Sequence, residues 1–252
     1  MLKTDTSHHK NNSAFSLIEL IVVVAICSLL TSMISYGVIY TRESARSAKC
    51  KNNLRNLAAA ALAYTTENND TFPWGMRKIG GYKSWCWDYV ITSDGKATPG
   101  IIWNYSADKK LFQCPSFLGG NSNANGEQYT GYNYNCSFIG KVEGDSGKRR
   151  TPAKLSHIKK PDKTALFGDG EFSGGANKFM RSPKRSTKHD ASSTSIREAG
   201  TQGFRHQGKT NIAFCDGHVE ELTEAYNSNG ELGFTSTRCG FISPDNSLYS
   251  LE

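Results

Sequence analysis

The chain has 252 residues and a formal net charge of +7, from 30 Lys and Arg against 23 Asp and Glu. This length suits one substantial domain with an added anchor and does not require two globular domains. The basic residues gather at 42–55, 148–160 and 178–188. They lack the interleaved aromatic residues of a single-strand nucleic-acid groove, so the commoner interpretation is a solvated face, and nucleic acid is not favoured as a partner.

A long apolar segment lies near the N-terminus. Residues 17–40 contain a single charged residue, Glu19. At about 1.5 Å per residue, a helix of this length crosses a hydrocarbon core about 30 Å thick. The segment is too long for the apolar region of a secretory signal peptide, which has roughly 7 to 15 residues. We therefore predict a retained transmembrane helix over residues 15–40.

The helical pattern continues beyond this segment. Apolar residues recur at spacings of three and four, which places them on one helical face: Cys50, Leu54, Leu57, Ala58, Ala61 and Leu62. Asn68-Asn69-Asp70, followed by Phe72-Pro73, is a stop signal. We predict one helix of about 50 residues, whose second part, over residues 41–69, is an amphipathic stalk.

The segment Ala14-Phe15-Ser16-Leu17-Ile18-Glu19 opens the apolar run. It resembles the class III signal of type IV prepilins and type II secretion pseudopilins, although Ala14 stands where that family usually has Gly. The resemblance implies that a prepilin peptidase removes residues 1–14 and methylates the new N-terminus at Phe15. It also implies a structural subunit that polymerises with other pilin or pseudopilin subunits.

Glu19 is a functional candidate on physical grounds alone. A carboxylate near the membrane is costly unless it is paired or reaches water. In a bundle of identical helices, Glu19 of one subunit could face the N-terminal ammonium of Phe15 in its neighbour and set the register of assembly. The alternative is that Glu19 only reaches the membrane surface.

Two features disagree on topology. The leader carries only Lys3 and Lys10 as basic residues, whereas five basic residues follow the span within 42–55. The positive-inside rule alone would therefore place the C-terminal domain in the cytoplasm. The processing motif requires a cytoplasmic leader, and we follow it: a single-pass protein of the inner membrane with its head outside the cytoplasm.

Residues 70–252 are predicted to form a β-rich head, because apolar runs there are short and separated by Gly, Asn, Ser and Asp. Predicted strands cover residues 89–92, 101–105, 132–139, 164–168, 211–215 and 218–222. Predicted loops cover residues 119–131, 140–152 and 172–203. The fold class is α+β, a pilin-like long N-terminal helix packed on an antiparallel sheet.

Near the C-terminus, His206 precedes Asp216-Gly217 by nine residues. This resembles the H-x9-D-G element of a large group of pilin-like proteins. Asp216-Gly217 suits a two-residue hairpin turn with positive φ at both positions, which would place Phe214 opposite Val219.

His206, Asp216 and His218 could together bind a divalent metal ion. Imidazole and carboxylate donors fit zinc or another transition metal better than calcium. The alternative, which we favour, is a plain hairpin whose loop accepts a hydrogen bond from His206. No cofactor is required under either interpretation.

Six cysteines lie outside the apolar segment, which holds Cys27. None forms a C-x2-C pair, and this argues against a structural zinc site. In an oxidising compartment, at least one disulfide is expected; the candidates are Cys86, Cys114, Cys136, Cys215 and Cys239. Our preferred pair is Cys114 with Cys136, although six cysteines allow 15 pairings. Cys50 is expected to stay free within the buried stripe.

Catalysis is not predicted. The chain lacks recognisable hydrolase motifs, and the one carboxylate pair considered, Asp169 and Glu171, flanks a glycine that suits a turn equally well. The four tryptophans could bind sugars or pack in the core. Besides the structural subunit, we therefore keep one alternative: a membrane-tethered module outside the cytoplasm that binds a polysaccharide or a metal ion.

Overall fold

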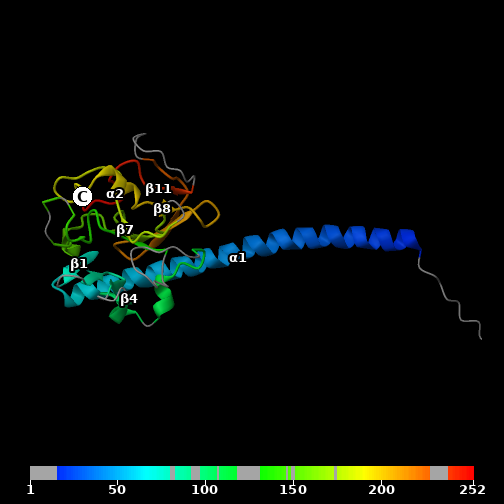
Figure 1. Cartoon of the computed structure of the whole chain (residues 1–252), viewed down its shortest axis with the longest axis horizontal. Helices are drawn as coiled ribbons and strands as arrows, with labels where there is room; N and C mark the ends of the chain where they lie inside the picture. Colours follow the sequence, from blue (N-terminus) through cyan, green and yellow to red (C-terminus); the bar gives the residue numbers. More distant parts are fainter. Residues whose placement is uncertain are drawn as a thin grey trace, which may run out of the picture. The chain divides into compact units, whose positions relative to one another are not determined.

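The computed structural model describes residues 16–79, 83–91, 97–106, 108–117, 131–145, 147–148, 151–172, 175–227 and 238–252. The chain divides into two compact units, Met1–Arg42 and Glu43–Glu252. Helix α1, Leu17–Glu67, has 51 residues and runs through both units (Figure 1). The predicted helix of about 50 residues is confirmed.

The first unit holds the apolar part of α1. Large apolar side chains are exposed there on every side, among them Leu17, Val24 and Ile39. This helix is long and apolar enough to cross a membrane. Apolar side chains all round a helix indicate an environment of lipid or of other apolar helices.

In the second unit, α1 carries the predicted apolar stripe. Cys50, Leu54 and Leu57 are fully buried and belong to the main core. The helix ends at Glu67, and Asn69 and Asp70 follow with positive φ values of 53° and 66°. Because a left-handed backbone cannot continue a right-handed helix, these two residues stop it where the stop signal predicted.

The described residues of the head form three sheets. The first is antiparallel with order β1-β2-β3-β4, formed by Met76–Ile79, Lys83–Cys86, Tyr89–Ile91 and Ala97–Pro99. The second has order β10-β9-β6-β5-β7, formed by Val219–Leu222, Thr210–Phe214, Ala165–Gly168, Asn133–Asn135 and Phe179–Met180. Only β5 and β7 in it are parallel. The third pairs β8, Gln202–Gly203, with β11, Cys239–Gly240. Four short helices complete the described elements: η1 Trp103–Tyr105, η2 Lys109–Phe112, η3 Leu155–His157 and α2 Thr194–Glu198.

The five-stranded sheet separates two apolar clusters. Along β9, Ala213 belongs to the cluster that contains the α1 stripe, whereas Ile212 and Phe214 belong to the other cluster, with Phe241. Successive strand residues point to opposite faces, so this alternation shows that both faces of the sheet are covered. The α+β pilin-like fold is confirmed.

The strand predictions were correct in part. Strands β3, β6, β9 and β10 lie where the sequence predicted them, and β5 occupies the first part of predicted strand 132–139. The predicted strand 101–105 is wrong, because residues 103–105 form the 3-10 helix η1. Strands β1, β2, β4 and β11 were missed, and the predicted loop 172–203 contains β7, α2 and β8. Most of the predicted loop 119–131 lies outside the described residues.

The β9–β10 hairpin differs from the prediction by one residue. Gly217 N donates to Phe214 O at 3.0 Å, and Phe214 N donates to His218 O at 2.9 Å. The loop is thus three residues long, and only Gly217 in it has positive φ, at +91°. A three-residue loop with a left-handed last residue is a standard hairpin connection. It moves Val219 opposite Ala213, not opposite Phe214 as predicted.

We expect Gly217→Ala to destabilise the head by about 1 to 2 kcal/mol, because an alanine in left-handed backbone is strained. The nearest heavy atom to an added Cβ is Leu62 Cδ1 at 3.8 Å, so steric clash contributes nothing. Gly217→Asn is the matched control, since Asn tolerates this conformation, and it should cost less. Urea unfolding followed by tryptophan fluorescence measures both. Equal costs for the two variants would contradict the backbone argument.

Candidate functional site

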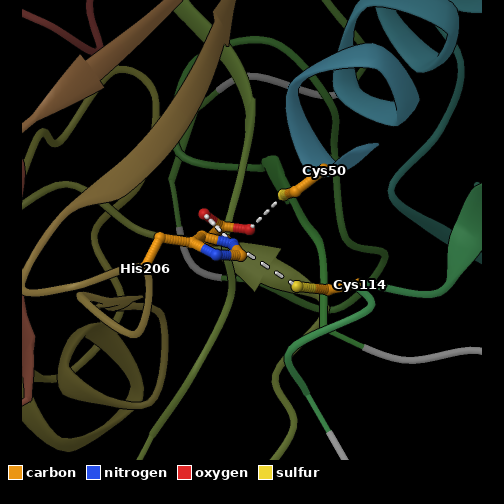
Figure 2. Close-up of side chains that lie close together, drawn as sticks. Cys50, Cys114 and His206 are labelled. Carbon is orange, nitrogen blue, oxygen red and sulfur yellow. Dashed lines mark hydrogen bonds and ion pairs between the residues drawn. The ribbon is translucent and has the colours of Figure 1, made fainter. Parts of the chain in front are cut away.

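Four metal-ligating side chains converge inside the second unit. Cys50, Cys114, Asp169 and His206 are all buried, and their ligand atoms lie within 4.8 Å of one another. Cys50 lies on α1, and Cys114 lies two residues after the end of η2. Asp169 directly follows β6, and His206 lies in the turn before β9. Figure 2 shows the Cys114 sulfur turned toward the imidazole of His206, and the Cys50 sulfur turned toward the carboxylate beside that ring.

Short contacts join the four groups. Cys50 Sγ lies 3.0 Å from Asp169 Oδ1. His206 Nε2 lies 3.4 Å from Asp169 Oδ2 and 3.7 Å from Cys114 Sγ. Asp169 Oδ2 also accepts a hydrogen bond from Asn211 N at 2.8 Å, which fixes the carboxylate against β9.

Local backbone geometry places His206. The backbone groups of His206 and Lys209 donate to each other's carbonyl oxygens at 3.1 Å, and Gln207 and Gly208 between them have φ values of 55° and 80°. Two consecutive residues with positive φ form a tight turn that Gly favours. This turn precedes β9 directly and holds the imidazole at the end of the strand that contacts Asp169.

A second set of groups surrounds the cluster. Glu43 Oε1 lies 2.9 Å from His206 Nδ1 and accepts a hydrogen bond from Ser116 Oγ at 2.6 Å. Arg205 Nε donates to Cys114 Sγ at 3.3 Å, and Arg205 Nη1 pairs with Glu171 at 3.0 Å. Glu171 therefore positions Arg205. This ion pair accounts for the position of Glu171 without a catalytic pair formed by Glu171 and Asp169.

The cluster shifts the proton affinities of its members. Burial alone would raise the pKa of Cys114, but its contact with Cys50 and the charge of Arg205 lower that pKa to about 5. Burial alone would lower the pKa of His206, but its contacts with Asp169 and Cys114 raise that pKa to about 10. Burial raises the pKa of Cys50. The lowered pKa favours the thiolate form of Cys114, which is the ligand form of cysteine.

The processing segment belongs to the first unit. Ala14 and Phe15 lie outside the described residues. Glu19 is in the first turn of α1, where its Oε2 accepts a hydrogen bond from Ser16 N at 2.9 Å. A carboxylate in the first turn is favoured by the free N–H groups of a helix N-terminus.

Residues 9–35 match the family model described as "Prokaryotic N-terminal methylation motif". The chain is therefore pilin-like in its N-terminal motif and in its long N-terminal helix packed on sheets. Residues 40–93, which contain Glu43 and Cys50, match a second family model, described as "Protein of unknown function (DUF1559)". No curated protein and no solved structure matches the chain. With its long apolar helix, the methylation motif indicates that the pilin-like protein is processed by prepilin peptidase and anchored in the membrane.

The structure does not bring His206 together with Asp216 and His218, the metal-binding set that the sequence analysis considered but did not favour. Asp216 Oδ1 contacts His218 Nδ1 at 2.6 Å on the surface, and the His218 ring stacks on Phe214 at 4.5 Å. His206 stands before β9 and Asp216 stands after it. Because five extended residues span about 17 Å, the strand itself separates them.

The cysteines of the pilin-like protein also differ from the prediction. None of the seven is in a disulfide, so the expected disulfide is not formed, whereas the prediction of a free, buried Cys50 is confirmed. Cys114 points into the cluster, while Cys136 packs beside Gly75, where even an added Cβ would collide with its sulfur. The two cysteines predicted to form a disulfide therefore lie in different parts of the core.

Sequence reasoning missed the cluster because it searched for closely spaced ligands. The four residues stand far apart along the chain, and only folding joins them. The available signal was weak: a cysteine on the buried helix stripe, a carboxylate directly after a buried strand, and the histidine of the H-x9-D-G element. None of these predicts a metal site alone.

Among the tryptophans, Trp87 is buried in the main core, and Trp103 stacks on Phe112 with ring centroids 4.8 Å apart. Trp74 lies under Arg77, and Trp85 is exposed. The described tryptophans therefore do not form one exposed aromatic platform of the kind a sugar-binding face needs.

Proposed function

We propose that this pilin-like protein is a non-catalytic structural subunit of a type II secretion or type IV pilus-like assembly, in which subunits associate through α1. The observation that carries the proposal is the exposure of apolar side chains all round α1 between Leu17 and Tyr40, with Glu19 as the only charge. A single membrane anchor needs this length, but it does not need a carboxylate at its start.

Glu19 supplies the recognition element in this proposal. Peptidase cleavage creates a positive amino group at Phe15, and the carboxylate of a neighbouring subunit pairs with it. In a setting without water, this pairing offsets the cost of both charges, and it specifies one axial register between helices.

The orientation in this proposal follows from processing. Prepilin peptidase acts on a leader in the cytoplasm, so residues 1–14 lie inside and the head lies outside the inner membrane. The basic residues at 42–55 oppose this orientation by the positive-inside rule. Within the second unit, part of that charge is paired: Lys51 pairs with Glu221 at 3.1 Å, and Arg46 contacts Glu43 at 3.6 Å.

Co-expression with a prepilin peptidase should shorten the chain by Met1 to Ala14 and leave an N-methylated Phe15. Intact-mass measurement of the membrane fraction decides this. Ala14→Leu, which replaces the small residue before the cleaved bond, is the control and should stay uncut. An uncut wild-type chain, or one cut after the apolar segment, would contradict the proposal.

A further inference from the structure

The strongest unexplained feature of the head is the buried cluster of Cys50, Cys114, Asp169 and His206. It offers two sulfurs, one imidazole nitrogen and one carboxylate oxygen. We propose that these four side chains form a structural zinc site that joins α1 to the head. This inference does not depend on polymer formation, because all four residues belong to the same compact unit.

The spacing of the donor atoms fits a tetrahedral metal. Zn–S bonds of about 2.3 Å and Zn–N or Zn–O bonds of about 2.0 Å place neighbouring ligand atoms roughly 3.3 to 3.8 Å apart. His206 Nε2 lies 3.7 Å from Cys114 Sγ and 3.4 Å from Asp169 Oδ2. Cys50 Sγ lies 3.0 Å from the other oxygen of that carboxylate, Asp169 Oδ1, so a metal bound through Oδ2 takes the place of the Cys50 thiol proton after a small shift of the sulfur.

The surrounding groups are those a zinc ligand set needs. A metal-bound histidine usually donates its other ring N–H to a carboxylate, which fixes the tautomer and ring orientation. Here His206 presents Nε2 to the cluster, and its Nδ1 lies 2.9 Å from Glu43 Oε1. Ser116 in turn donates to Glu43, which holds that carboxylate in place.

Charge balance also favours a divalent ion. Two thiolates and the Asp169 carboxylate exceed the charge of one zinc ion by one unit. Arg205 donates to Cys114 Sγ and lies 3.4 Å from Asp169 Oδ1, so its positive charge offsets part of this excess, although it also pairs with Glu171 at 3.0 Å. Fully buried charges need such a balance because uncompensated ions are costly in the interior.

Thiolate donors make zinc a better fit than calcium or magnesium, which prefer oxygen ligands. All four donors are protein groups and the side chains are buried. A closed four-ligand set is typical of structural zinc, whereas catalytic zinc keeps one position for water. The site is therefore expected to stabilise the packing of α1 and not to perform chemistry.

The test uses the full chain purified in detergent through a tag that does not bind metal. Elemental analysis should find about one zinc per chain. Cys114→Ser should lower zinc affinity at least about tenfold, whereas Cys215→Ser, the matched loss of another buried thiol, should retain the metal. Glu43→Gln tests the positioning role and should weaken zinc binding by about 10- to 100-fold. Equal zinc content in the Cys114 and Cys215 variants would overturn the proposal.

A second measurement needs only the wild-type chain and remains decisive if the Cys114 variant fails to fold. Protein stripped of metal and loaded with cobalt should show thiolate-to-cobalt charge-transfer absorption, which zinc then removes. Absence of this absorption overturns the proposal. So does a disulfide between Cys50 and Cys114 in non-reducing peptide mapping of the purified protein, because oxidised sulfurs cannot bind the metal as thiolates.

Discussion

Glu19→Ala should leave membrane insertion and leader cleavage intact and abolish entry of the subunit into a polymer. The change makes α1 more apolar, so insertion is not weakened. It removes the proposed partner of the Phe15 amino group in the neighbouring subunit. Two unit charges about 4 Å apart contribute about 4 kcal/mol at an effective dielectric constant of about 20. Loss of this pairing energy corresponds to roughly a thousandfold weaker association between subunits.

Cross-linking between cysteines introduced near Phe15 and Glu19 measures this association in membranes. Thr31→Val is the matched control, because it also raises the apolarity of α1. The Thr31 hydroxyl donates within the helix, to Cys27 O at 2.9 Å and to Ser28 O at 3.0 Å. The control should assemble like the wild type. Normal cross-linking of Glu19→Ala would show that the carboxylate does not set the register.

The same experiment separates the structural subunit from a tethered binding module. A module uses α1 only as an anchor, so its mature form would be monomeric, and substitution of Glu19 would change nothing in cross-linking. A strictly monomeric wild-type protein with affinity for a polysaccharide would favour the module.

Asp190→Asn should destabilise the head by about 3 to 5 kcal/mol. Asp190 is buried between two guanidinium groups, Arg181 at 3.2 Å and Arg197 at 3.6 Å, and it accepts a hydrogen bond from Ser137 Oγ at 2.6 Å. Removing one partner of a buried ion pair leaves an uncompensated charge in the interior, and this costs more than the pair itself contributes. Total domain stability is only about 5 to 15 kcal/mol, so the variant should be marginally folded.

Urea unfolding of the full chain, followed by the fluorescence of the buried Trp87, measures this loss. Asp162→Asn is the control, because Asp162 is exposed, and it should change stability by less than about 0.5 kcal/mol. Burial alone would raise the pKa of Asp190, but Arg181 and Ser137 outweigh it and lower the pKa to about 2. The contribution of Asp190 is therefore full above its ordinary pKa near 4 and is lost as the pH falls through about 2. Equal stability of the two variants would contradict this role.

The long helix could be read from the sequence because its causes are local. The apolar run, the spacing of Cys50, Leu54 and Leu57, and the stop at 68–70 each act within a few residues. The same is true of the processing motif at residues 14–19. Such features do not depend on which distant segments pack nearby.

The strands were less predictable, because short strands owe their existence to their partners. Residues 103–105 have a strand-like composition, yet Trp103 stacks on Phe112 and the backbone turns there. Met76 to Ile79 have no clear alternation, yet they pair with β2. In both cases the partner outside the segment, and not the composition of the segment, decided the structure.

For this protein, the sequence by itself determined the anchor, the processing motif, the helix and its buried stripe, and the position of the last hairpin. Only the tertiary structure decided which side chains share a site. His206 precedes Asp216-Gly217 by nine residues, but the extended strand β9 lies between them and separates their side chains. Cys50 and His206 are far apart in the chain, yet the α1 stripe and β9 pack on the same core and bring them together. Sequence spacing reports distance only within one regular element, and between elements the packing of the core sets it.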